Sequence, residues 1–89
     1  MHERALMRDL VGRIDELAAA EEAKTVTRIS VRLGALSHFT PEHFREHFED
    51  AARGTRAEGA EVEATLSDDT TGADAAGVVL ETIELEVPG

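Results

Sequence analysis

The stretch Thr25-Val26-Thr27-Arg28-Ile29-Ser30-Val31-Arg32-Leu33-Gly34 decides the fold of this chain. Apolar and polar residues alternate along it, with Ile29, Val31 and Leu33 on one side and Arg28, Ser30 and Arg32 on the other. A period of two is typical of a β-strand that buries one face. The strand is therefore predicted over residues 25–33, and Gly34 ends it.

An amphipathic helix is predicted on each side of this strand. Residues 3–22 carry apolar side chains at helical spacings of three and four, namely Leu6, Met7, Leu10, Val11, Ile14, Leu17 and Ala18. The second helix is predicted from Pro41 to about Arg53, with Thr40 as its N-cap and Gly54 as its stop. Its core stripe is predicted to be Phe44, Phe48 and Ala51 or Ala52.

Two further alternating stretches, residues 60–66 and 78–87, predict two more strands. The predicted inward residues are Ala60, Val62, Ala64 and Leu66 in the first and Ile83, Leu85 and Val87 in the second. Their outward positions carry Glu61, Glu63, Glu84 and Glu86. The intervening residues 67–77 have turn composition and no apolar period, which predicts a connector.

The order α-β-α-β-β predicts one α/β (α+β) domain over residues 1–89, with two helices on one face of a three-stranded sheet. The first two strands are joined through a helix and should be parallel, whereas the last should return antiparallel, which makes the sheet mixed. Opposite charges on neighbouring strands contribute roughly 0.2–1 kcal/mol per pair. The strand with Arg28 and Arg32 is therefore expected beside at least one acidic strand.

Composition excludes several classes of function. The chain has no cysteine, which rules out disulfides, thiolate zinc sites and cysteine nucleophiles. Its net charge is −10, and no lysine or arginine follows Arg56, which argues against nucleic acid as a partner. No stretch is apolar enough for a membrane span or a signal peptide, and no catalytic constellation is present. We therefore expect a cytoplasmic protein that is not an enzyme.

The chain starts with Met1-His2-Glu3, which is a candidate metal site. The α-amine of Met1, the His2 imidazole and the backbone nitrogens near Glu3 can converge on one ion. Planar, nitrogen-rich coordination suits Ni(II) or Cu(II) better than Zn(II), which prefers a tetrahedron. The alternative is that His2 is a frayed terminal residue.

Three other histidines are weaker candidates. His43 and His47 are four residues apart on the second predicted helix and share a face, so they could clamp a metal beside Glu46 or Asp50. A solvated polar face is the favoured interpretation, because no third ligand is evident from the sequence. His38, in the loop after the first strand, is interpreted as exposed, with a supplementary role at the His2 site as the alternative.

Taken together, these segments resemble the HypA/HybF family of nickel metallochaperones for hydrogenase maturation. The matching stretches are Met1-His2-Glu3 with Ala5-Leu6-Met7, Val26 to Ser37, Pro41-Glu42 with Phe48-Glu49, Gly54-Thr55 to Glu58-Gly59-Ala60, and Leu85-Glu86-Val87. The resemblance implies that Met1, His2 and Glu3 bind Ni(II), with His2 as the essential ligand. It also implies delivery of nickel to the hydrogenase large subunit together with a maturation GTPase, and some members also serve urease.

The sequence departs from that family in one segment. Family members carry a zinc ribbon with two Cys-x-x-Cys pairs where this chain has residues 67–77, so no zinc is expected here. The leading hypothesis is a nickel metallochaperone for a nickel enzyme such as [NiFe]-hydrogenase, as a monomer or weak homodimer. The alternative is a metal-independent protein–protein interaction module derived from the same fold.

Overall fold

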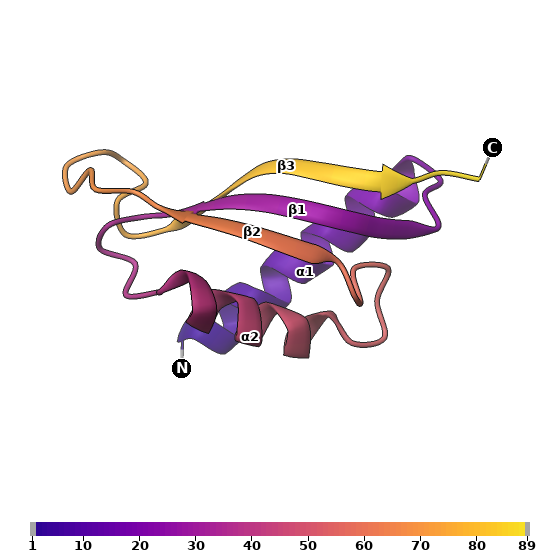
Figure 1. The fold of residues 1–89 in the computed structure, drawn as a ribbon, viewed down its shortest axis with the longest axis horizontal. Helices are drawn as coiled ribbons and strands as arrows, with labels where there is room; N and C mark the ends of the chain where they lie inside the picture. Colours follow the sequence, from indigo (N-terminus) through magenta and orange to yellow (C-terminus); the bar gives the residue numbers. More distant parts are fainter. Residues whose placement is uncertain (1, 89) are drawn as a thin grey trace.

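The structure, a computed structural model, describes residues 2–88, and of His2 the backbone alone. It contains α1 (His2–Ala20), β1 (Thr25–Leu33), α2 (Pro41–Ala52), β2 (Glu61–Leu66) and β3 (Val78–Glu86). Both helices lie on the same side of a three-stranded sheet (Figure 1). The predicted α-β-α-β-β order and the two-layer arrangement are confirmed.

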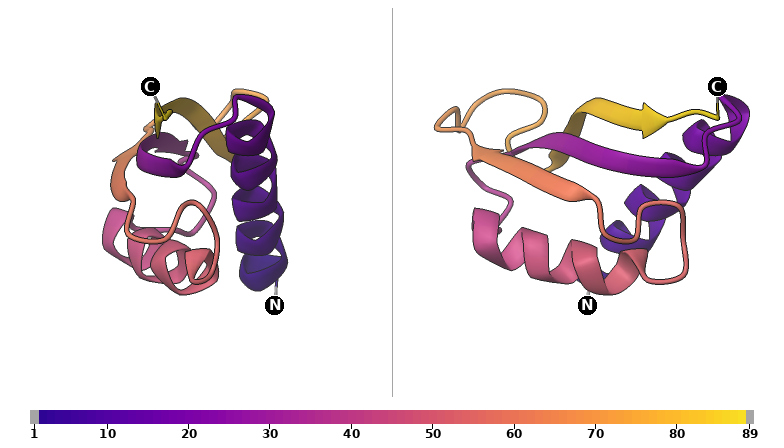
Figure 2. Two further views of the ribbon diagram at one scale, coloured as in Figure 1. Left: turned by 90° about the vertical axis from the view of Figure 1, so that its right-hand side faces the viewer. Right: turned by 45° about the vertical axis from the view of Figure 1, so that its right-hand side comes forward.

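The sheet has the order β2-β1-β3, with β1 parallel to β2 and antiparallel to β3. The basic strand therefore lies between both acidic strands, which confirms and extends the prediction. Arg28 forms ion pairs with Glu63 on β2 and with Glu84 on β3, the latter at 3.8 Å. Because Ile29 and Val31 of β1 are buried and Arg28 alternates with them, these pairs lie on the sheet face opposite the helices. Figure 2 shows that neither helix covers that face.

Irregular pairing between β1 and β3 explains why the sequence pattern of the last strand is blurred. The register shifts between Val26 and Arg28 and again between Ser30 and Val31, so that Thr27 of β1 and Glu81 of β3 are extra residues. A bulge restores the inward direction after an odd step along a strand. Val26 and Ile29 are three residues apart, yet both are fully buried.

The core consists of apolar side chains from all layers, and no polar or charged residue within the described range is buried. Its largest fully buried members are Phe44, Phe48, Met7, Ile14, Ile29 and Leu33. Phe44 and Phe48 stack with ring centroids 6.2 Å apart, on the face of α2 that the sequence predicted. Burial of side chains of this size contributes roughly 1.5–3 kcal/mol each.

Three predicted core residues are wrong. Leu17 is 45% exposed, because the buried stripe of α1 follows Met7, Val11, Ile14 and Ala18 instead. Leu66 and Val87 are each 53% exposed. Leu66 is the last residue of the edge strand β2, and Val87 comes after the end of β3, so both lie where the sheet ends.

Helix α1 ends at Ala20, two residues before the predicted end, because the chain forms a Schellman turn there. The Ala23 N–H donates to the Ala18 carbonyl at 2.8 Å and the Glu22 N–H to the Ala19 carbonyl at 3.0 Å. Glu22 has a φ of 57°, in the left-handed region that this turn requires. Ala18 and Ala23 are both buried, and their burial directs the chain into β1.

Residues 67–77 form a loop that returns along the end of β1. The Gly34 N–H donates to the Gly77 carbonyl at 2.8 Å and the Leu36 N–H to the Ala75 carbonyl at 2.7 Å. A Cβ at Gly34 would meet the Ala75 carbonyl group well inside van der Waals contact. Only glycine therefore fits at this crossing.

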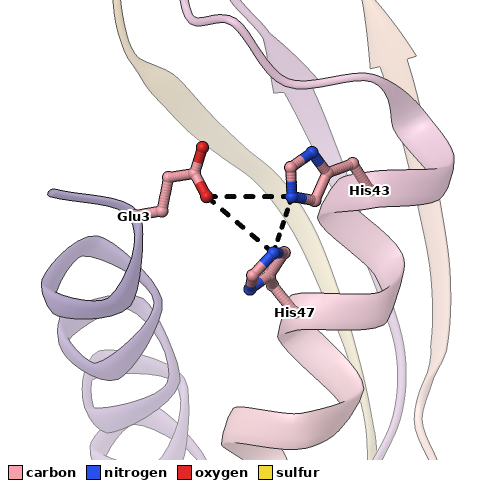
Figure 3. Close-up of side chains that lie close together, drawn as sticks. All are labelled: Glu3, His43 and His47. Carbon is pink, nitrogen blue, oxygen red and sulfur yellow. Dashed lines mark hydrogen bonds and ion pairs between the residues drawn. The ribbon is translucent and has the colours of Figure 1, made fainter. Parts of the chain in front are cut away.

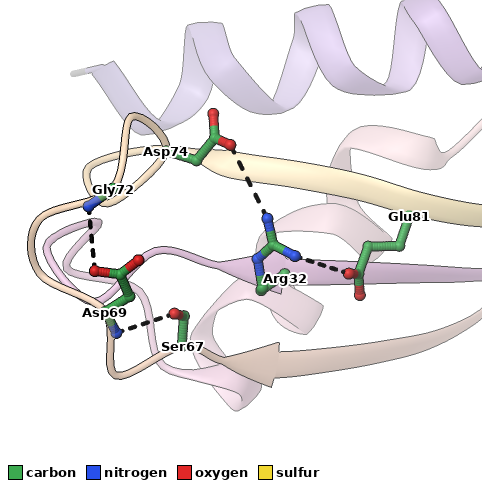
Figure 4. Close-up of polar contacts among 6 residues, drawn as sticks. All are labelled: Arg32, Ser67, Asp69, Gly72, Asp74 and Glu81. Atoms are coloured by element: carbon green, nitrogen blue, oxygen red, sulfur yellow. Dashed lines mark hydrogen bonds and ion pairs between the residues drawn. The ribbon is translucent and has the colours of Figure 1, made fainter.

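Side chains also hold this connector (Figure 4). Arg32 pairs with Glu81 at 3.1 Å and with Asp74 at 4.0 Å. The Asp69 carboxylate accepts hydrogen bonds from the backbone N–H groups of Thr71 (2.9 Å) and Gly72 (3.1 Å). Hydrogen bonds from the Thr71 backbone and side chain and from the Gly72 backbone lower the pKa of Asp69 below its ordinary value.

Candidate metal centre

Of the residues that the sequence predicts as nickel ligands, His2 and Glu3 belong to the start of α1. Met1 lies outside the described residues. His2 is the first residue of α1, and only its backbone is described. Glu3 is in the first turn of the helix, and its side chain is 42% exposed. Of the three predicted ligands, the structure therefore describes one side chain.

That side chain meets the two histidines of α2 (Figure 3). The Glu3 Oε2 atom lies 3.7 Å from His43 Nε2 and 3.8 Å from His47 Nε2. The two Nε2 atoms are 2.6 Å apart, within reach of one N–H···N hydrogen bond. Within residues 2–88, apart from the His2 side chain, this is the only group of three or more potential metal ligands. The sequence alone did not indicate that Glu3 joins the histidine pair.

Helix α2 positions the histidines through its own local structure. The His43 N–H donates to Thr40 Oγ1 at 3.1 Å, so the N-cap predicted from the sequence is confirmed. Residues four apart share a helix face, and the adjacent face carries the buried Phe44 and Phe48. The phenylalanines hold α2 against the core, and the histidines then project towards the start of α1 at 43% side-chain exposure.

Aromatic contacts also hold the ring of His43 in place. The ring of Phe39, itself buried, meets His43 edge-on with centroids 5.9 Å apart. The rings of His43 and His47 lie 4.4 Å apart and are tilted by 40°. Both histidines are part-exposed, as expected for a solvated polar face, and a third side chain from a different helix lies beside them.

The other predicted candidate does not join the cluster. His38 is an exposed loop residue with a φ of 67°, as the favoured interpretation expected. Glu46 and Asp50, the acids weighed as partners of the histidine pair, are not part of the three-residue cluster. The carboxylate comes from the chain start instead of from α2.

A groove of about 810 Å³ runs between α1 and α2 next to the cluster. Its walls include Glu3 and His47, the apolar Met7 and Val11, and Gly12, where a Cβ would have open space. The groove makes the ligand cluster accessible from outside. Neither described helix has the length and apolar composition that crossing a membrane requires.

The fold defines a class of protein: a small α/β domain, whose two helices here bring imidazole and carboxylate side chains together at the start of α1. The chain matches, over residues 1–85, the family model described as "Hydrogenase/urease nickel incorporation, metallochaperone, hypA". This protein therefore belongs to the HypA family.

Curated relatives support this assignment. The hydrogenase maturation factor HypA of Archaeoglobus fulgidus is 36% identical over 66 residues, which is 74% of this chain and 60% of that protein. The HypA of Methylocella silvestris is 38% identical over 63 residues, 71% of this chain and 56% of its own length. The matched region thus spans little more than half of these relatives.

A solved structure shows the same fold at lower identity. The solution structure of the Ni metallochaperone HypA from Helicobacter pylori superposes with a TM-score of 0.79 and 15% identity. The superposition covers 97% of this chain and 98% of that one. The arrangement of helices and strands is therefore retained where most side chains differ.

Proposed function

We propose that this chain is a nickel metallochaperone that delivers Ni(II) during maturation of a nickel enzyme, with [NiFe]-hydrogenase as the client. The observation that carries the proposal is the family match over residues 1–85, which includes Met1-His2-Glu3. The metal is cargo, so the protein binds and releases it without catalysing a reaction. Its partners are the hydrogenase large subunit and a maturation GTPase, with urease accessory proteins as further candidates.

The nickel ligands of this proposal are the α-amine of Met1, the imidazole of His2 and backbone nitrogens of His2 and Glu3. Helix α1 begins at His2. Because the first four N–H groups of a helix have no intrahelical acceptor, these nitrogens can bind a metal without breaking helix hydrogen bonds. The positive end of the helix dipole opposes a cation, and deprotonated amide ligands offset that repulsion.

Calorimetric titration of Ni(II) into wild type, His2→Ala and His38→Ala tests the site. The His2→Ala protein should lose the tightest nickel-binding phase, whereas His38→Ala, a matched loop variant, should retain it. Blocking the amine with an N-terminal extension should have the same effect as His2→Ala. Because the ligands must lose protons before they bind, nickel affinity should also fall with decreasing pH. Equal binding by all proteins would refute the assignment.

A second candidate function is a metal-independent interaction module, favoured by the groove along α1 and by the short connector 67–77. The purified hydrogenase large subunit distinguishes the two functions. If wild type and His2→Ala bind it equally with all nickel chelated, the interaction does not need the metal. If binding requires nickel and His2, the result supports the nickel metallochaperone function.

A further inference from the structure

We propose that Glu3, His43 and His47 form a second metal site, built from side chains, for a late first-row divalent cation such as Zn(II). The site uses no terminal amine and no backbone nitrogen. It shares residue Glu3 with the site at the chain start, but it uses the Glu3 carboxylate where that site uses backbone nitrogen, and it does not rest on the proposed function. Two imidazoles and one carboxylate are a known ligand set for zinc with further positions open.

The three ligand atoms are already spaced for one ion. At Zn–N and Zn–O distances of about 2.0–2.2 Å, two tetrahedral ligand atoms lie about 3.3 Å apart. The observed separations of 2.6, 3.7 and 3.8 Å bracket that value, and the three atoms lie within 4.8 Å of one another. A small opening of the His43–His47 pair and a small approach of Glu3 would complete the coordination. Both movements are side-chain rotations at half-exposed residues.

The site is held by the fold and not by a single flexible segment. Thr40 caps the first turn of α2, and the buried Phe44 and Phe48 hold the helix on the core. The edge of Phe39 supports the ring of His43. Ligands that are preorganised in this way lose less conformational entropy on binding, which favours affinity.

Charge and exposure suit a dication. Two neutral imidazoles and one carboxylate supply a single negative charge, and no lysine or arginine completes an ion pair with Glu3 among the described side chains. Side-chain exposures of 42–43% leave room for water at the remaining coordination positions. Glu3 and His47 also line the groove between the helices, so an ion could exchange through it.

The competing account is that the cluster is only a hydrogen-bonded histidine pair beside a carboxylate. In that account one N–H···N bond and an ion pair to a protonated imidazole satisfy all three side chains. The two accounts differ in what Zn(II) does. A metal at this site would tie the first turn of α1 to α2, whereas a hydrogen-bonded pair would gain nothing from the ion.

The test uses the full chain with His2→Ala as background, which removes the imidazole of the other site. Zn(II) is titrated calorimetrically into His2→Ala, into His2→Ala/His43→Ala/His47→Ala, and into His2→Ala/His38→Ala. We expect one equivalent to bind to the background protein and to the His38→Ala control. Since even loss of an outer-shell partner costs about 10–100-fold in metal affinity, loss of both imidazoles should cost at least roughly 100-fold.

Two further readouts separate ligand loss from misfolding. Circular dichroism should be the same for all variants, because both histidines are half-exposed. Zn(II) should raise the Tm of the background protein and of the His38→Ala control, and leave the triple variant unchanged. If the triple variant binds Zn(II) as tightly as the background protein, the proposal is wrong. Failure of this site would leave the Ni(II) comparison of wild type with His2→Ala unaffected.

Discussion

The cluster at the start of α1 is held together by side-chain contacts, whereas the connector 67–77 is held mainly by backbone hydrogen bonds. The cluster joins Glu3 to His43 and His47 through side chains from two helices, at distances that can change by an ångström without disturbing the backbone. The connector is fastened by backbone hydrogen bonds from Gly34 and Leu36 and by the turn around Asp69. It contains no cysteine.

This difference separates the contacts that fix the fold from the side chains proposed to bind a metal. Backbone hydrogen bonds fix the connector, and a Schellman turn and an N-cap fix the helices that carry the cluster. The three side chains of the cluster are part-exposed, and no polar side chain is buried among the described residues. We therefore expect substitutions in the connector to alter stability, and substitutions in the cluster to alter metal binding.

The largest expected effect on stability is at the connector. Gly34→Ala places a Cβ against the Ala75 carbonyl group, and the loop segment around Ala75 must move away. Overpacking of this kind costs about 1–3 kcal/mol, measured as the free energy of unfolding in urea. Gly12→Ala is the matched control, because its Cβ meets open space, and it should gain about 1 kcal/mol from helix propensity. Zn(II) affinity should stay unchanged in Gly34→Ala; a parallel loss would mean that the two regions are coupled.

A smaller effect is expected at the helix that carries the histidines. Thr40→Ala removes the acceptor of the His43 N–H and should cost about 1 kcal/mol of stability. Because the cap orders the turn that holds His43, Zn(II) affinity should fall in the same variant. Thr40→Ser keeps the hydroxyl and should restore both quantities. A Thr40→Ala protein with reduced stability and unchanged Zn(II) affinity would show that the cap does not preorganise the site.

Most of the fold was predictable because its local signals agree with its packing. The alternation at 25–33, the Thr40-Pro41 helix start and the opposite charges of the strands each led to the observed element or pairing. Leu17 was misplaced because several apolar stripes on α1 have helical spacing, and only tertiary packing selects the one at Met7, Val11 and Ile14. The bulges at Thr27 and Glu81 were likewise not predicted, because an alternating sequence pattern does not indicate where an extra residue is inserted.

The cluster was only half predictable. The spacing of His43 and His47 on one helix is a local signal, and the sequence analysis found it. Glu3 is forty residues away along the chain, and nothing in the sequence specifies how α1 crosses α2. The joint arrangement of the two helices depends on packing of α1 and α2 around the same core, and this long-range contact appears only in the folded chain.

The smallest expected effect is a pH dependence at the connector, and it tests whether the Asp69 turn contributes to fastening the loop. The pKa of Asp69 is lowered from 3.8 in the folded protein, so the ionised carboxylate stabilises the fold above that pH. This contribution should decline as the pH falls below 3.8 and through the lowered folded-state pKa. Asp69→Asn keeps the shape and an acceptor but not the charge. Urea unfolding should therefore show wild type more stable than Asp69→Asn at neutral pH, with the difference shrinking in acid. A difference that does not vary with pH would assign the contribution to the geometry of the turn and not to its charge.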